Sequence, residues 1–311
     1  MAQGFNLEFR SQQEWGWLLA TWLFLSGTGS GLFLLYEFYH LPPEFAWWSL
    51  GTIVLGGLVL LWELGSPLRA WRGISRLGSS WLSRGALSVG LFVLCGALFL
   101  APGVVSGLPW AQGGTLSKAL EWIAALGALM ISLYPGFFLA KNRSIPFWNT
   151  ALLPVISFGF ALLGASALAL LVAPGVAPGS VQILAGVLLL LNLVLLGGYL
   201  WAMGRAGGAA QESVRLLNSA PLSGIFRIGV VLVGIALPGI LLLWFPSLRV
   251  LAAAGMLLGT FLFRYCVLKA GVYVPATLVP QGMDLSRLKP TSADLQREYA
   301  AMAAQSPSGR G

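Results

Sequence analysis

Side chains that can exchange protons lie near the ends of long apolar segments. Glu14 precedes the first segment, Glu63 ends the second, and Tyr134 lies close to the end of the fourth, while Arg69 follows Glu63 in a loop. Ionisable groups at such positions are costly in a membrane, so each is a candidate functional residue. A carboxylate, a phenol and a guanidinium at one depth can hydrogen-bond the two hydroxyl groups of a quinol and accept its protons.

A plainer interpretation of the same residues stays open. Glu63 can form an ion pair with Arg69 at the lipid interface, where such a pair contributes little. Tyr134 can belong to the aromatic belt that lines membrane surfaces. Residue type alone does not separate a ligand site from these structural roles.

The composition is that of a membrane protein. Of the 311 residues, 57% are hydrophobic and only 9% are charged, with a mean hydropathy of +0.82. Soluble domains carry about 25% charged residues. The net charge of +8 comes from basic residues in short loops, which indicates membrane orientation rather than nucleic-acid binding.

Apolar stretches of the length that a bilayer requires predict an all-α protein with eight transmembrane helices, arranged as two four-helix bundles. The domain is expected over residues 1–280, and a polar, flexible tail over 281–311. The expected spans are Trp15–Tyr39, Phe45–Trp62, Gly85–Ala101, Leu120–Leu139, Ala151–Ala173, Val181–Met203, Ile225–Phe245 and Leu248–Leu268.

Basic residues are distributed unevenly between the two faces of this topology. The face that carries both termini has 16 of the 18 Lys and Arg residues. The positive-inside rule therefore predicts cytoplasmic termini in a prokaryotic inner membrane. A basic face is also suited to docking an acidic subunit, so the asymmetry has a second explanation that would allow the opposite orientation.

The connection between the fourth and fifth spans contains the turn around which the predicted site is organised. It runs from Lys141 past Pro146, and Phe147 and Trp148 are expected in the interfacial zone. Asn149 or Thr150 is expected to cap the next helix. A water-facing turn would then lie beside the phenol of Tyr134.

The first span carries small residues over Ser26–Gly31. Small residues at this spacing let another helix or a flat ligand approach the backbone closely. Helix packing is the expected role. A phosphate-binding loop is excluded because no strand precedes the motif.

Ligands for a metal centre are scarce. His40 is the only histidine, so a bis-histidine haem cannot form within the chain, and two cysteines, Cys95 and Cys266, cannot ligate an iron–sulfur cluster. An electron leaving a quinol would therefore pass to a cofactor in another polypeptide.

Several motifs together resemble the NrfD/polysulfide-reductase family of membrane subunits. The resemblance covers spans one to five and eight, and spans six and seven by hydropathy. The motifs are the Gly-rich first span, Glu63–Arg72, Ser79–Ala86, Tyr134–Gly136 with Pro146–Asn149, and Arg264–Gly271.

The resemblance implies a haem-free membrane anchor that exchanges electrons between menaquinone or ubiquinone and a four-cluster, ferredoxin-like iron–sulfur subunit. A molybdopterin subunit would carry out the terminal chemistry, so this chain would not be catalytic alone. By position, Tyr134 would bind the quinone, Glu63 would lie on the proton route, and Arg69 would face the partner. Further headgroup contacts are expected from Glu14, Trp15, Thr28, Ser30 and Asn149.

Two alternatives remain at this stage. A passive anchor would share the fold but have no quinone site of its own. A secondary transporter would have broken helices, charges at the bilayer midplane and related halves. No internal repeat is found, and the ionisable groups lie near the interface.

Overall fold

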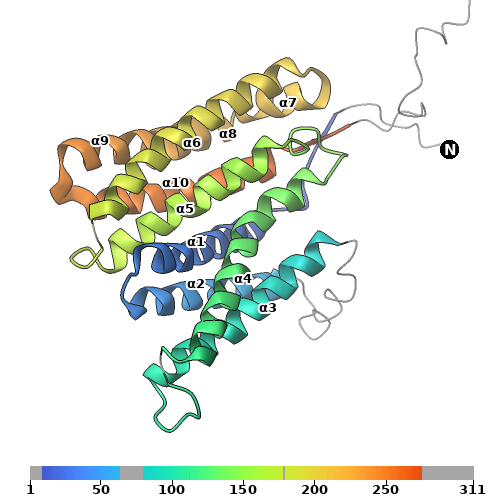
Figure 1. Ribbon diagram of the computed structural model, residues 1–311. Coiled ribbons are helices and arrows are strands. Elements are labelled where there is room, and N and C mark those ends of the chain that lie inside the picture. The colour runs from blue at the N-terminus through green and yellow to red at the C-terminus, as the bar shows by residue number, and fades with distance from the viewer. Residues whose placement is uncertain (1–8, 64–79, 112, 178, 275–311) are drawn as a thin grey trace, which may run out of the picture. The chain divides into compact units, whose positions relative to one another are not determined.

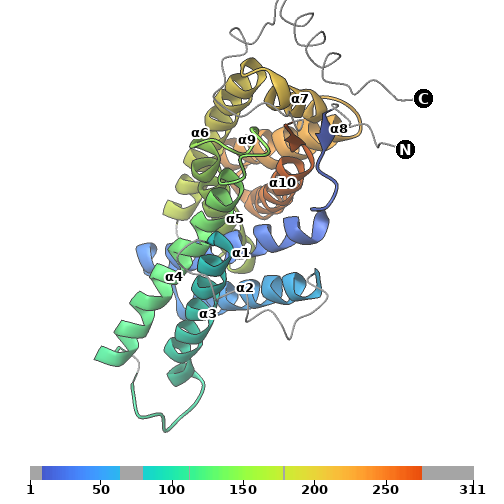
Figure 2. The ribbon, with the colours of Figure 1, turned by 90° about the vertical axis from the view of Figure 1, so that its right-hand side faces the viewer.

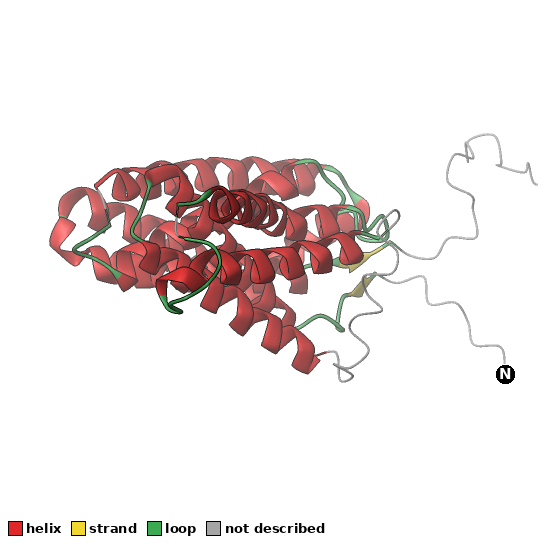
Figure 3. Cartoon of the chain, turned by 60° about the horizontal axis from the view of Figure 1, so that its bottom comes forward, coloured by secondary structure: helices red, strands yellow, loops and turns green. Residues whose placement is uncertain are grey.

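The computed structural model describes residues 9–63, 80–111, 113–177 and 179–274 (Figure 1). Arg69 and the tail at 281–311 lie outside these residues. Almost all of the described chain is helical (Figure 3). Eight of its helical segments are long and apolar enough to cross a membrane, which confirms the predicted number of spans.

The elements follow the predicted order with shifted ends. The first five long helices are α1 (Trp17–Tyr39), α2 (Pro43–Glu63), α3 (Trp81–Leu100), α4 (Thr115–Ala140) and α5 (Leu152–Val172). The remainder are α6 (Gly179–Arg205), α7 (Gly208–Leu217), α8 (Leu222–Gly224), η3 (Ile225–Ala236), α9 (Leu237–Trp244) and α10 (Arg249–Lys269). Two short strands, β1 (Arg10–Ser11) and β2 (Val272–Tyr273), pair antiparallel.

Helix α1 contacts α2, α4, α5 and α10, as Figures 1 and 2 show. Its small residues account for these contacts. A Cβ on Gly29 would lie 3.0 Å from Ser49 O of α2, and one on Gly31 would lie 2.8 Å from Ala161 O of α5. The stretch Ser26–Gly31 is therefore a helix-packing surface, as expected. The division into two four-helix bundles stays a prediction.

Phe147 and Trp148 are buried within the protein, so their rings do not contact the lipid interface as expected. Trp148 is 0% exposed, and its indole Nε1 donates to Val267 O of α10 at 2.8 Å. The Tyr199 hydroxyl donates to Phe147 O. The indole finds its acceptor inside the protein because the connection between α4 and α5 packs against the end of α10.

Replacing Trp148 with phenylalanine should lower the stability of the folded chain by about 1–3 kcal/mol, because Val267 O would lose a buried donor. Thermal unfolding in detergent measures the change. The matched control is Trp122→Phe, since Trp122 is exposed on α4. Equal midpoints for the two variants would contradict a role for the indole hydrogen bond.

The cap of α5 differs from the prediction. The helix begins at Leu152, whose backbone N–H donates to Thr150 Oγ1 at 3.0 Å. Asn149 does not act at this helix: its side-chain amide donates to Ala140 O, the last residue of α4. Thr150 therefore contributes to the start of α5, and Asn149 satisfies the end of α4.

The connection after the sixth span contains a helix that the sequence did not predict. Helix α7 buries Ala209, Ala210, Ser213 and Leu217 on one side. The seventh span begins with α8, continues through the π-helical segment η3 and ends with α9, which contains Pro238 in its first turn. Wide helical turns of this length are unusual in proteins.

Candidate functional site

A cavity of about 170 Å³ lies between α3 and α4 at the end where α3 begins and α4 ends. It contains Tyr134, the residue that the sequence placed at the centre of the site. Its lining residues are Trp81, Arg84, Gly85, Ser88, Met130, Leu133, Tyr134 and Phe137.

A glycine of α3 leaves room for the Tyr134 ring to pack closely against that helix. A Cβ on Gly85 would lie 2.6 Å from Tyr134 Cε2, so only glycine leaves space for the phenol ring. The other side of the ring contacts Phe138, with ring centroids 5.5 Å apart. Tyr134 lines the cavity, so its hydroxyl can donate a hydrogen bond to a ligand there.

Two aromatic rings that stack on each other and a cation complete the lining of the cavity. The rings of Trp81 and Phe137 stack with centroids 5.1 Å apart and an angle of 5°. The Arg84 guanidinium carbon lies 5.0 Å from the centroid of Trp81, a cation–π contact that holds the charge at the cavity. Met130 and Phe137 are also exposed on the outer surface of α4. In a bilayer this surface faces lipid.

Trp15 packs on Phe138, the residue whose ring also contacts Tyr134. Its indole packs on Phe138 at a centroid distance of 5.6 Å and stacks on Trp148 at 5.2 Å. Phe138 thus separates Trp15 from Tyr134. Trp15 supports the wall behind the phenol and does not line the cavity.

The two hydroxyl residues predicted on α1 point to different neighbours. Ser30 shares a 2.8 Å hydrogen bond with Ser132 of α4, two residues before Tyr134. Thr28 faces α5 and α10 instead: its Oγ1 lies 2.5 Å from where a Cβ on Gly164 would be, and Thr260 also borders that point. Neither residue lines the cavity.

The structure does not bring the predicted carboxylates to the cavity. Glu63 is the half-buried last residue of α2, and its Oε2 is buried without a hydrogen-bond partner among the described residues. Glu14 is exposed beside Tyr273. Burial, and then the Glu14 carboxylate, raise the pKa of the Tyr273 phenol. Arg69 lies outside the described residues.

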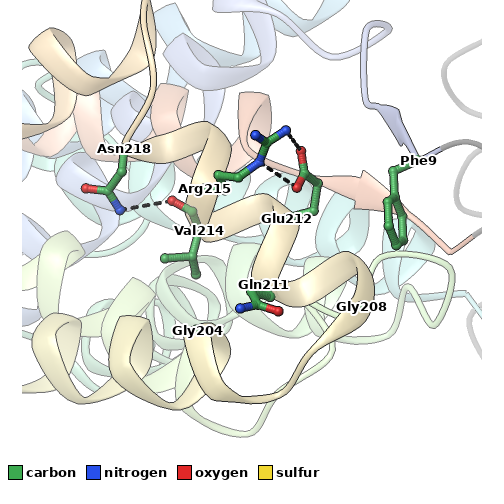
Figure 4. Close-up of a pocket in the computed structure, with 8 residues that line it drawn as sticks. All are labelled: Phe9, Gly204, Gly208, Gln211, Glu212, Val214, Arg215 and Asn218. Atoms are coloured by element: carbon green, nitrogen blue, oxygen red, sulfur yellow. Dashed lines mark hydrogen bonds and ion pairs between the residues drawn. The ribbon is translucent and has the colours of Figure 1, made fainter.

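A second, larger cavity of about 500 Å³ lies at the surface beside α7 (Figure 4). Its lining includes Phe9 and Asn218 at its edges and the ion pair of Glu212 with Arg215, which has an N–O distance of 2.8 Å. The hydrogen bond from Arg215 lowers the pKa of Glu212. Because the two charges are paired and no predicted site residue lines this cavity, we regard the cavity between α3 and α4 as the candidate site.

Polar contacts also join α1 and α4 at the opposite end. The Tyr36 hydroxyl donates to Glu121 Oε1 at 3.4 Å, and Glu37 lies next to the same carboxylate. Among the described residues, no group of three or more His, Cys, Asp or Glu side chains could hold a metal ion.

Sequence reasoning identified Tyr134 but missed the residues of α3 that face it. Trp81, Arg84 and Gly85 occur in one turn at the start of that helix. The available signal was the motif Ser79–Ala86, in which a glycine follows an arginine at the start of a span. Which side of α3 faces α4 depends on packing, which that signal does not specify.

Comparisons with known proteins agree with this architecture. The family described as "Polysulphide reductase, NrfD" matches residues 6–276. A curated relative, "Protein NrfD" of Escherichia coli (strain K12), is 27% identical over an alignment of length 307, and the match covers 83% of this chain and 94% of that protein.

Proposed function

The chain belongs to the polysulphide reductase, NrfD family of multi-pass membrane proteins, and on that premise we propose that it binds the quinone headgroup in the cavity between α3 and α4. In this proposal the chain is the membrane subunit of an oxidoreductase complex. It exchanges electrons between menaquinone or ubiquinone and an iron–sulfur partner subunit. The observation that supports it most directly is a cavity beside lipid that contains a phenol and a cation.

The residues of the cavity fit a quinone headgroup. Gly85 lets the Tyr134 ring reach the cavity, and the rings of Trp81 and Phe137 give it an apolar aromatic lining of the kind found in ligand pockets. The volume of about 170 Å³ suits a single ring. An isoprenoid tail would remain in lipid, next to Met130 on the exposed surface of α4.

Each residue has a separate task in this proposal. Tyr134 donates a hydrogen bond to an oxygen of the headgroup and so fixes its orientation. The positive charge of Arg84 stabilises negative charge that develops on the headgroup of the ligand. A bound quinone supplies the two-electron, two-proton chemistry. Glu63, at the same end of the spans, is proposed to receive protons that leave the cavity.

The partner subunit is proposed to dock on the face where the cavity lies. This face carries most of the basic residues, including Lys141 and Arg143 in a described loop and Arg205 at the end of α6. Arg264, which the sequence count assigned to this face, is instead buried within α10. Complementary charge would steer an acidic subunit to it. Such a subunit would carry iron–sulfur clusters and connect to a molybdopterin subunit. By the positive-inside rule, we place this face in the cytoplasm of a prokaryote.

Replacing Tyr134 with phenylalanine tests the proposal. The variant should assemble normally, because the ring keeps its packing on Phe138 and Gly85. Quinol-dependent turnover of the complex should fall about tenfold, as one hydrogen bond to the headgroup is lost. Binding of a fluorescent quinol-site inhibitor should weaken in parallel.

Tyr39→Phe provides the matched control, because Tyr39 ends α1 on the opposite side of the spans. Its turnover should equal that of the wild type. A passive anchor predicts instead that the inhibitor does not bind and that both variants behave alike. Unchanged quinol kinetics in Tyr134→Phe would remove Tyr134 from the site.

A further inference from the structure

Arg264 of α10 is buried where α1, α5 and α10 meet. Only 3% of the residue is exposed. One guanidinium nitrogen donates to Ser157 O of α5 at 2.7 Å. The same nitrogen lies 3.4 Å from where a Cβ on Gly27 of α1 would be. The guanidinium thus contacts all three helices at a point within the transmembrane spans.

The charge of Arg264 has no visible counter-charge. A guanidinium remains protonated in proteins and offers five N–H donors. Among the residues that the structure describes, no carboxylate forms an ion pair with it. The neighbouring Phe263 ring, with its centroid 5.7 Å from the guanidinium carbon, offers only a weak contact. Burial of a charge without compensation is strongly unfavourable.

Other polar atoms at this junction also lack partners. Arg264 Nε is buried without a hydrogen bond to any described residue, and so are the hydroxyl oxygens of Thr28, Ser157 and Thr260. These four residues come from α1, α5 and α10. Thr28 and Thr260 both approach Gly164, and Ser157 supplies the carbonyl that binds Arg264. Thr28 follows Gly27, which the guanidinium approaches, and Thr260 lies one turn before Arg264 on α10, so these unsatisfied polar atoms lie along the junction that contains the cation.

We propose that α1, α5 and α10 enclose a water-binding site centred on Arg264. Water fits these groups because it can accept from the guanidinium and donate to the hydroxyl oxygens. A carboxylate or halide could accept from Arg264 and from the hydroxyls of Thr28 and Thr260, and the labelling experiment below, which detects water alone, distinguishes it from water.

This site is separate from the cavity between α3 and α4. None of its residues lines that cavity, and the inference does not depend on quinone binding. It explains why Thr28 does not face Tyr134: its hydroxyl belongs to the water site. Bound water would also spread the Arg264 charge over three helices and so hold α1 against α5 and α10.

Hydroxyl-radical labelling in H₂¹⁸O tests this in the intact wild-type protein, because an X-ray pulse turns bound water into radicals that oxidise adjacent rings. Phe160 and Phe263 stack on each other next to Arg264, with centroids 3.8 Å apart. Phe33 and Phe92 are equally buried between α1 and α3. All four are no more than 1% exposed, so a difference in exposure to bulk solvent cannot cause a difference in their labelling rates. The first pair should be labelled several-fold faster.

Two variants link the labelling to the polar atoms. Arg264→Met should reduce labelling of Phe160 and Phe263 to the level of Phe33 and Phe92. Thr28→Val, which keeps the shape of the side chain, should reduce it partly. If Arg264→Met does not fold, the comparison of the two phenylalanine pairs in the wild-type protein still tests the proposal. Wild-type labelling of Phe160 and Phe263 no faster than that of Phe33 and Phe92 would overturn the proposal.

Discussion

Replacing Gly85 with leucine is expected to abolish quinol-dependent turnover of the assembled complex. Even the Cβ would lie 2.6 Å from Tyr134 Cε2, and the rest of the side chain would enter a cavity of about 170 Å³. The phenol and the headgroup would both lose their places. Gly85→Leu fills the cavity, whereas Tyr134→Phe removes only one hydrogen bond. The loss of turnover should therefore be larger in Gly85→Leu.

Gly90→Leu is the control on the same helix. Gly90 is exposed on α3, and a Cβ there would meet nothing within 4 Å. Its turnover should match that of the wild type, measured as quinol oxidation by the purified complex. Normal turnover in an assembled Gly85→Leu complex would show that the headgroup binds elsewhere. Equal losses in both variants would point to general damage to α3.

Replacing Gly136 with alanine should destabilise the whole transmembrane domain. Gly136 lies in α4, two residues after Tyr134, and its Cβ would overlap Pro154 Cα of α5. A backbone atom in a helix cannot move aside as a flexible side chain does. The two helices would have to separate, and overpacking of this kind is expected to cost on the order of 3 kcal/mol.

Thermal unfolding in detergent measures this loss, and Gly197→Ala is its control. Gly197 is exposed on α6 with nothing within 4 Å of its Cβ position. Alanine favours a helix over glycine, so the control should unfold at the same or a slightly higher temperature. A normal midpoint for Gly136→Ala would mean that α4 and α5 do not touch at Pro154.

The positions of the spans were predictable because hydropathy is a local property. Backbone groups in lipid must be paired within one helix, so each apolar stretch of sufficient length forms a span. Hydropathy does not predict the structure of the connections between spans. Helix α7 was missed because its ten residues alternate small, polar and apolar side chains without a long apolar run.

The prediction for Phe147 and Trp148 failed for a related reason. An amphipathic ring prefers the membrane interface only when no partner inside the protein satisfies it. Val267 O accepts from the Trp148 indole, and Gly271 makes room for it. Residues more than 100 positions away in the sequence supply that partner, and composition does not predict such a contact.

The candidate site also contains residues that the sequence predicted and residues that it did not. Its phenol, Tyr134, was predictable from its type and its depth in the fourth span. The α3 residues that face it, and the separation of Thr28 from Ser30, were not predictable, although Thr28 and Ser30 lie on one helix. Adjacent positions on a helix point in different directions, and the neighbours they meet depend on how α1 packs against α4, α5 and α10.

The amino-acid sequence by itself therefore determined the membrane spans, their order and the excess of basic residues on one face, because each depends on residues close together in the chain. Tertiary structure alone decided which side of α3 meets Tyr134 and which three helices surround Arg264. Those contacts join residues from separate helices. In lipid, close packing of small residues such as Gly85, Gly27 and Gly164 selects them, and hydropathy does not.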